Sequence, residues 1–192
     1  MQNCCHTHKE CARDTFIPTR LVDIGNEHES LRLIITSEDD RFNGDRDVPP
    51  FLALSYCWGP PQASYPPLKT EAISLVSRLR GIASDSVPKT IADALTVTRA
   101  LGYRFIWIDS LCIIQDDPSD WQKESSLMRR IYGSASVTLV AASSTSAYDG
   151  FLKRKIQQYS LCLMTHHVIP PREDTSMSNP KPAKSVALWR VF

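Results

Sequence analysis

A carboxylate, Glu124, is placed where a helix should bury its apolar side chains. The sequence predicts a helix over residues 119–132, opened by an Asp-rich turn with a proline near the first helical turn. The steps from Trp121 to Glu124, Met128 and Ile131 are three, four and three residues, which is the spacing of one helical face. A carboxylate in such a position is a candidate functional group.

A structural explanation of Glu124 fits the same pattern. In this interpretation the carboxylate lies at the edge of the apolar stripe and pairs with Arg129 or with a backbone amide near the helix start. Periodicity does not separate the two interpretations, so both stay open at this point.

Two buried strands are predicted to bring further candidate side chains to one edge of a sheet. Residues 51–56 form a continuous apolar run that suits a central strand, and residues 105–108 are β-branched and aromatic. Asp109 follows the second strand, and we expect residues 110–115 to continue extended. Open α/β sheets place their ligands beyond the carboxyl ends of parallel strands. Residues 55–58 and 109–110 should therefore lie close together.

The loop after the first buried strand contains two residues suited to a binding site. Gly59 permits another group to approach the backbone closely. Trp58 has two interpretations: its ring packs in the core, or it stacks on an aromatic ring of a ligand. The same two alternatives apply to Trp121. Asp109 either caps or bonds the backbone, or it orients a substrate.

The remaining elements complete an α/β pattern. Further strands are predicted at residues 16–23, 31–35 and 136–142, and helices at residues 70–79 and 88–101. The first two strands are separated by a polar turn and should form a hairpin. We therefore expect an α/β fold with three layers: a mostly parallel sheet flanked by helices, preceded by a short β-hairpin.

Length and charge limit the classes of protein to which this chain can belong. At 192 residues it is long enough for one domain with tails, and 22 basic against 21 acidic residues give no indication of nucleic-acid binding. No window approaches the roughly 18 apolar residues of a membrane span, and the N-terminus has no apolar signal region. We expect a soluble, cytoplasmic protein with no membrane span and no nucleic-acid partner.

The cysteines suggest reduced thiols and no native metal site. Cys57 and Cys112 lie in apolar segments and are expected to be reduced and buried. The N-terminus contains residue types that ligate zinc, but it has no CxxC pair and no matching second half-site. These residues are Cys4, Cys5, His6, His8 and Cys11.

Several segments resemble the fungal heterokaryon-incompatibility (HET) domain. They are Ala53-Leu54-Ser55-Tyr56-Cys57-Trp58-Gly59, Pro88-Lys89-Thr90-Ile91-Ala92-Asp93-Ala94, Trp107-Ile108-Asp109-Ser110-Leu111-Cys112 and Asp120-Trp121-Gln122-Lys123-Glu124, with Pro18-Thr19-Arg20-Leu21-Val22-Asp23 upstream. The resemblance implies a HET domain over residues 16–155, after a disordered Cys/His-rich terminus at 1–15 and before a poorly ordered tail or truncated remainder at 156–192. It also implies a role in non-self recognition and programmed cell death, through self-association or docking on a protein partner.

A second resemblance concerns mechanism. HET domains are distantly similar to TIR domains, which have a flavodoxin-like α/β fold, and some of which cleave NAD with a helix glutamate. Trp121 followed three residues later by Glu124 matches that TIR pattern, and Ser55-Tyr56 resembles the Ser-Tyr pair of the first TIR strand. This implies an alternative NAD nucleosidase activity, with NAD as substrate rather than as cofactor. Glu124 would be catalytic, and the substrate-binding candidates would be Ser55, Tyr56, Trp58, Gly59, Asp109 and Trp121.

The sequence departs from the pattern of the HET family near residue 189. Family members usually continue after a tryptophan with Gln-Glu and further helices, whereas Trp189 is followed here by Arg190-Val191-Phe192. A truncated domain is expected on this ground, and an inactive fragment is the third functional alternative.

Overall fold

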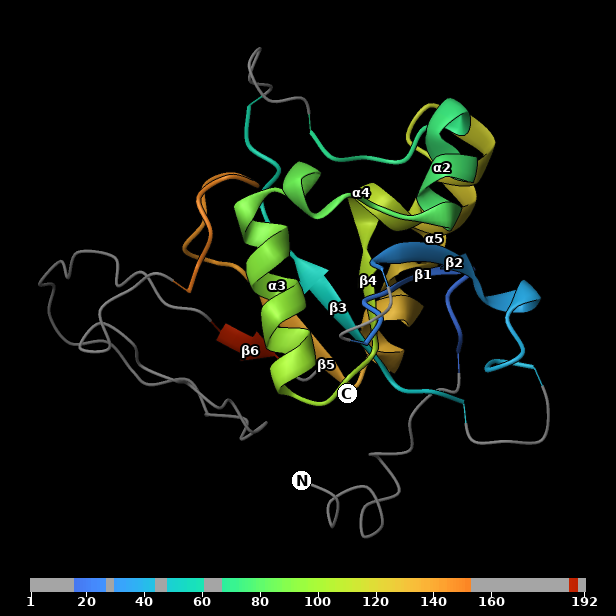
Figure 1. The fold of residues 1–192 in the computed structure, drawn as a ribbon, viewed down its shortest axis with the longest axis horizontal. Helices are drawn as coiled ribbons and strands as arrows, with labels where there is room; N and C mark the ends of the chain where they lie inside the picture. The colour runs from blue at the N-terminus through green and yellow to red at the C-terminus, as the bar shows by residue number, and fades with distance from the viewer. Residues whose placement is uncertain (1–15, 27–29, 44–47, 61–66, 153–186, 190–192) are drawn as a thin grey trace, which may run out of the picture.

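The computed structural model describes residues 16–26, 30–43, 48–60, 67–152 and 187–189. In this part of the chain, six strands form one sheet in the order β2-β1-β4-β3-β5-β6, with helices on both faces (Figure 1). The predicted α/β class is confirmed. The parallel strands lie at the centre of the sheet, and antiparallel strands flank them on both sides.

The centre of the sheet consists of β3 (Phe51–Ser55), β4 (Phe105–Ile108) and β5 (Val137–Val140). β3 pairs in parallel with both neighbours, so Leu54 lies opposite Ile108 on one side and Leu139 on the other. Every residue of β4 is buried, as expected for a strand that is covered on both faces. The prediction of a central strand at residues 51–56 is confirmed.

The N-terminal hairpin is part of this sheet. β1 (Arg20–Asp23) and β2 (Arg32–Ile35) pair antiparallel, and β1 also pairs antiparallel with β4. At the opposite side β6 (Ala187–Trp189) pairs antiparallel with β5. The hairpin predicted from the sequence therefore extends the sheet beside β4, the strand that Asp109 follows.

Two longer helices, α3 and α5, lie on opposite faces of the sheet (Figure 1). The 3-10 and α-helical segments are η2 (Thr36–Glu38), η3 (Ala72–Ser74), α2 (Leu75–Arg80), η4 (Ser84–Ser86), α3 (Lys89–Ala100), α4 (Asp109–Cys112) and α5 (Pro118–Ser134). Asp117 caps α5 by accepting the backbone N–H groups of Ser119 and Asp120 at 2.9 and 3.2 Å. The predicted helix at 119–132 is thus confirmed, with slightly wider bounds.

The segment after Asp109 was expected to be extended, and this expectation is wrong. Residues 109–112 form the helical turn α4, in which the Ile113 N–H donates to the Asp109 carbonyl oxygen at 3.1 Å. The Asp109 carboxylate accepts the N–H of Ser110 at 2.7 Å, which satisfies a donor at the start of the turn. Leu111 and Cys112 are fully buried, so a helical turn places both apolar side chains in the core.

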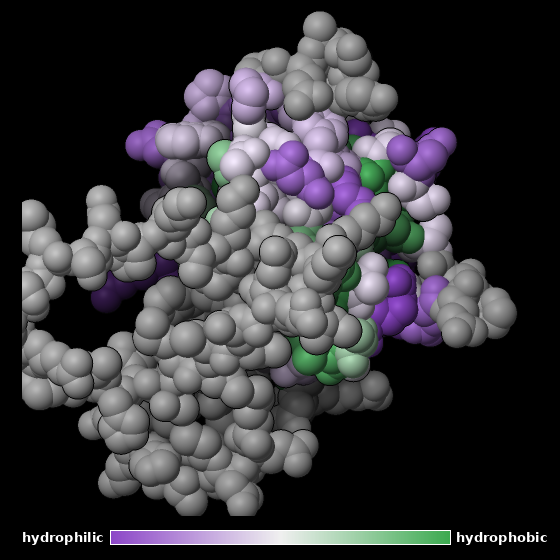
Figure 2. Space-filling view, turned by 90° about the vertical axis from the view of Figure 1, so that its left-hand side faces the viewer, coloured by the Kyte–Doolittle hydropathy of each residue, from purple (hydrophilic) through white to green (hydrophobic). Residues whose placement is uncertain are grey.

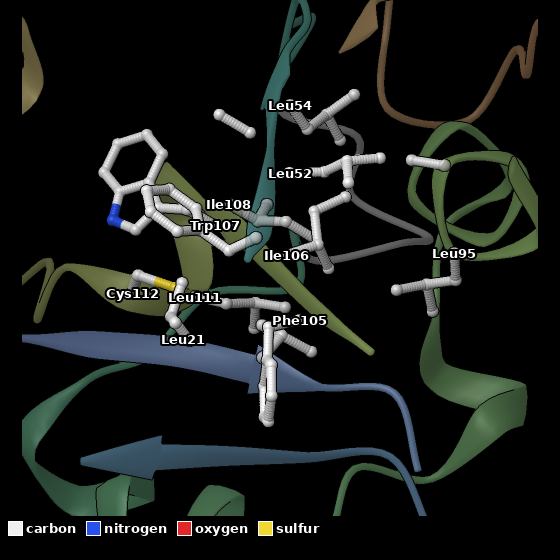
Figure 3. Close-up of a cluster of buried hydrophobic side chains, with 14 of the residues drawn as sticks. Leu21, Leu52, Leu54, Leu95, Phe105, Ile106, Trp107, Ile108, Leu111 and Cys112 are labelled. Atoms are coloured by element: carbon white, nitrogen blue, oxygen red, sulfur yellow. The ribbon is translucent and has the colours of Figure 1, made fainter. Parts of the chain in front are cut away.

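Buried side chains from strands and helices meet in one core (Figure 3). Trp107 is fully buried, and its ring meets that of Tyr132 from α5 edge-on at a centroid distance of 5.5 Å. Figure 3 shows Trp107 with Cys112 on one side of the cluster and Leu95 of α3 on the other. The sheet is therefore the middle of three layers.

Among the described residues, no helix is both long enough and apolar enough to cross a bilayer. On the face in Figure 2, hydrophobic residues are interspersed among hydrophilic ones.

Candidate functional site

Glu124 is completely buried on α5, with 0% of its surface exposed. Its predicted place on the inner face of the helix is confirmed, and Ile131 shares this face. Trp121 was expected on the same stripe but is 52% exposed. A step of three residues turns an α-helix by about 300°, roughly 60° short of a full turn. In the first turn of α5 this offset is enough to leave the indole at the surface.

The contacts of Glu124 come mainly from the N-terminal hairpin region. The Thr19 hydroxyl donates to Oε1 at 2.7 Å, and Nη2 of Arg20 lies 4.0 Å from the same oxygen. Nζ of Lys123 lies 3.9 Å away. Oε2 is buried and has no hydrogen-bond partner among the described residues. The alternative pairing with Arg129 is wrong, because the groups that the structure places beside the carboxylate are Thr19, Arg20 and Lys123.

Arg20 organises the polar cluster around Glu124. Its Nη2 donates to both carboxylate oxygens of Asp120, at 2.6 and 2.5 Å, and its Nε donates to the Cys112 carbonyl oxygen at 2.6 Å. Asp120 also accepts the N–H of Ile114 at 2.8 Å. One guanidinium of β1 therefore holds α4 and the first turn of α5 against the sheet.

The roles of Thr19, Arg20 and Asp120 at this site were not predicted from the sequence. Two features of the sequence indicate the pairing of Arg20 with Asp120. Arg20 is followed in β1 by the apolar residues Leu21 and Val22, and a buried arginine needs a carboxylate partner. Asp120 precedes Glu124 by four residues, which places both carboxylates on one side of the helix.

A second polar network lies where β3 and β4 end. Trp58 donates its indole N–H to Asp109 Oδ2 at 3.0 Å, and the Ser110 N–H donates to Oδ1 at 2.7 Å. Burial raises the pKa of Asp109 to about 6, while these two hydrogen bonds act in the opposite direction. The predicted meeting of residues 55–58 and 109–110 is thus confirmed.

Two tyrosines border this network. The Tyr56 hydroxyl donates to Oγ of Ser110 at 2.9 Å, and the Tyr132 hydroxyl donates to the Leu54 carbonyl oxygen at 3.3 Å. Burial raises the pKa of both phenols, and the nearby charge of Asp109 acts in the same direction. Both hydroxyls therefore stay protonated at neutral pH.

Gly59 makes the close backbone approach predicted from the sequence. Its φ is +78°, and an added Cβ would lie only 2.5 Å from Cβ of Ser146. The neighbouring Trp58 carbonyl oxygen accepts the N–H of Ala147 at 3.2 Å, and the carbonyl oxygen of Ser55 accepts the N–H of Ala141 at 2.9 Å. These contacts attach the loop after β3 to the loop after β5.

The structure thus divides the candidate residues between two networks. Glu124 is bound to Thr19 and Arg20, whereas Tyr56 and Trp58 are grouped with Asp109. The Cys112 thiol lies within electrostatic range of both. Burial raises its pKa to about 12, with further upward contributions from the charges of Asp109 and Glu124.

Cys57 and Cys112 are both free thiols, but only Cys112 is buried. Cys57 is exposed because it follows the end of β3, which corrects the expectation of burial. The candidate zinc ligands Cys4, Cys5, His6, His8 and Cys11 lie outside the described residues, as do the predictions of disorder at 1–15 and over most of 156–192.

Comparison with known proteins identifies one family. The family model for heterokaryon incompatibility protein (HET) matches residues 51–187, from the start of β3 to the first residue of β6. Neither a curated protein nor a solved structure matches the chain. The matched region is more than half of the chain and contains Asp109 and Glu124. This chain is a member of the heterokaryon-incompatibility (HET) family.

Proposed function

We propose that this protein acts in fungal non-self recognition and signals programmed cell death by docking on a second copy or on a protein partner. The observation that carries the proposal is the family match over residues 51–187. It spans the parallel centre of the sheet and all of α5, so the resemblance concerns most of the core of the domain and not a short motif.

Two features of the fold are consistent with a docking role. The buried Arg20 network joins β1, α4 and α5 into one body, so the surface elements on these helices are held in fixed positions. Large apolar side chains are also exposed, among them Ile73 at 91% and Trp121 at 52%. Such side chains add apolar contact area when another protein binds over them.

Expression in fungal cells tests the proposal. We expect induction of the full chain to cause cell death, measured by uptake of a membrane-impermeant dye, and we expect a fold-disrupting Arg20→Met variant to leave the cells alive. The experiment is run in strains that are compatible and in strains that are incompatible with the source of the chain. If the wild-type protein accumulates in the folded form and the cells of both kinds of strain survive equally, the proposal is wrong.

An NAD-cleaving activity is the second candidate function, and one observation favours it. Oε2 of Glu124 is buried and has no hydrogen-bond partner among the described residues. Burying an oxygen without a hydrogen bond destabilises the folded protein, and a functional role explains why such a group is kept. When nicotinamide leaves NAD, positive charge develops on the ribose, and a carboxylate stabilises it. Trp58 and Asp109 remain candidates for binding the substrate. Because Glu124 is fully buried, a substrate reaches it only if side chains that cover the carboxylate, such as Thr19 and Arg20, move away.

Incubation of the purified protein with NAD tests this candidate. Nicotinamide release should be lost in Glu124→Gln, which keeps the shape of the side chain, and retained in Arg129→Gln at an exposed position of the same helix. If the wild type leaves NAD intact while cell death persists in Glu124→Gln, the enzymatic candidate is excluded. Lack of a cooperative melting transition would instead favour the third alternative, an inactive fragment.

A further inference from the structure

The geometry points to Asp109 and the aromatic side chains beside it as a binding site for an alkylammonium group, carried by a small amine or by a lysine side chain. The site lies where β3 and β4 end, at the edge where open α/β sheets bind ligands. The inference goes beyond the proposed function, because it concerns the network of Asp109 and requires neither cell death nor NAD cleavage.

Asp109 is a half-buried carboxylate whose charge no basic side chain balances. Among the residues that the structure describes, no lysine or arginine forms an ion pair with it. Burial raises its pKa to about 6, so the group is still mostly ionised at neutral pH. A negative charge therefore remains in a poorly solvated place, and a cation bound beside it would stabilise that charge.

The carboxylate is able to accept a ligand from solvent. Oδ1 accepts the Ser110 N–H and Oδ2 accepts the Trp58 indole N–H, and a carboxylate oxygen has room for about two hydrogen bonds. An ammonium group supplies N–H donors together with its charge, and charge-assisted hydrogen bonds are the stronger kind. Asp109 and Trp58 each keep part of their surface exposed, so a ligand reaches them without opening the fold, in contrast to the buried Glu124.

Aromatic side chains from three further elements lie near this charge. Trp58 comes from the loop after β3 and contacts the carboxylate through its indole N–H. The Tyr56 phenol lies within electrostatic range of Asp109, of Tyr132 on α5 and of Tyr148 in the loop after β5. Aromatic rings attract organic cations through their faces, and tryptophan does so most strongly. Carboxylate and rings together favour a cation with an organic surface.

A divalent metal ion fits this site less well. Calcium and magnesium need several oxygen ligands. The described part of the chain contains no group of three or more His, Cys, Asp or Glu residues that could hold a metal ion. A single carboxylate beside aromatic rings is better suited to an ammonium group, which needs one counter-charge and gains from the rings.

Titration of the purified full chain with butylammonium at pH 8 tests the site. We expect saturable binding with a Kd of about 1–10 mM, observed as a shift of the NMR signal of the Asp109 carboxyl carbon. Ligand-observed NMR compares the variants. Asp109→Asn should weaken binding by roughly tenfold or more. Asp85→Asn is the matched control, because Asp85 is an exposed carboxylate on η4 and should not affect binding.

Two changes at Trp58 test the contribution of the ring. Trp58→Leu removes both the aromatic face and the indole donor and should weaken binding by about tenfold. Trp58→Phe removes the donor but keeps an aromatic face, so it should bind more tightly than the leucine variant. Equal affinities in the two variants would overturn the aromatic part of the site.

Competing ligands define the cation. Butanol has the same carbon chain without the charge and should not displace butylammonium, and potassium chloride should displace it only weakly. Nα-acetyllysine amide should compete, because it presents the same ammonium group on a chain of equal length. Tighter binding of the lysine derivative indicates a peptide as the source of the group, and tighter binding of butylammonium indicates a small amine.

The site is overturned if folded wild-type protein shows no saturable binding, or if folded Asp109→Asn binds as tightly as wild type. Circular dichroism and thermal melting identify a variant that fails to fold. In that case the shift of the Asp109 carbon in wild type and the comparison of the two Trp58 variants decide. Displacement by potassium as effective as that by lysine derivative overturns the assignment to an organic cation. Binding without cell death in fungal cells overturns the proposed function and leaves the site standing.

Discussion

Arg20 of β1 and Asp120 of α5 form a buried ion pair across 100 residues of sequence, with Nη2 at 2.6 and 2.5 Å from the two carboxylate oxygens. The two side chains are 7% and 13% exposed. The match to the HET family begins at residue 51, after the hairpin that supplies Arg20. Because this arginine also lies 4.0 Å from Glu124, we conclude that the hairpin is an integral part of the domain.

Replacing Arg20 with methionine should strongly destabilise the protein. The change keeps an apolar stem but leaves Asp120 and Glu124 with unbalanced negative charge in a buried place. Loss of one partner from a buried ion pair costs about 3–5 kcal/mol of unfolding free energy. Chemical denaturation monitored by circular dichroism measures this loss.

Arg32→Met is the matched control for that experiment. Arg32 lies on the neighbouring strand, its side chain is 45% exposed, and Nη2 is 3.8 Å from the Asp23 carboxylate. An ion pair of this kind contributes about 1 kcal/mol or less. Equal losses in the two variants would show that burial of the Arg20 pair has no special importance.

Asp109 should make the stability of the protein fall as the pH rises from about 4 to about 6. Burial raises its pKa from 3.8 to about 6, so the folded state binds the proton more tightly than the unfolded state. The resulting stabilisation is complete below the unfolded pKa and is lost as the pH passes the folded pKa. The difference of about two units between the folded and unfolded pKa values of Asp109 corresponds to roughly 2 kcal/mol of unfolding free energy, after allowance for the partial exposure of the side chain.

The comparison variant for this pH dependence is Asp109→Asn, which is uncharged at every pH. Asp23, Asp39 and Asp149 have lowered pKa values because of their hydrogen bonds, and they act in the opposite direction. The difference in unfolding free energy between wild type and variant cancels their effect. A difference that stays constant between pH 4 and pH 6 would refute the prediction.

Trp58→Phe should raise the pKa of Asp109 above its wild-type value. The indole N–H donates to the carboxylate at 3.0 Å and stabilises its charged form, whereas phenylalanine keeps an aromatic ring without the donor. Titration of the Asp109 carboxyl carbon by NMR measures the shift. Trp121→Phe, at an exposed position, should leave the titration unchanged, and a shift in that control would point to an indirect effect.

Gly59→Ala should destabilise the protein more than Gly102→Ala. The two glycines have nearly equal φ angles, +78° and +77°, so an alanine is strained to the same degree at both. At Gly59 the new methyl group also meets Ser146 at 2.5 Å, while at Gly102 nothing lies within 4 Å. We expect losses of roughly 3 kcal/mol and about 1 kcal/mol, respectively. Thermal denaturation measures the loss of stability in each variant. Equal losses would show that Ser146 moves away from residue 59 at little energetic cost.

Local features of the site were predictable from the sequence. The apolar run at residues 51–56 identified a central strand, and the parallel arrangement then required Trp58 and Asp109 to meet at one edge. The helical turn α4 was missed because its four residues are too few to show a period. The exposure of Trp121 was missed because helical spacing identifies the apolar face of α5 but does not show whether a residue at the margin of that face is buried.

The sequence by itself determined the order of the main strands and helices other than α4 and β6, the family resemblance and the position of Glu124 on an apolar helical stripe, because each depends on local spacing along the chain. Only the tertiary structure decided which groups surround that carboxylate. Thr19 and Arg20 reach it from more than 100 residues away, because β1 pairs with β4 and thereby comes to lie beside α5. Such contacts follow from how the strands pair, and no periodicity along the chain encodes them.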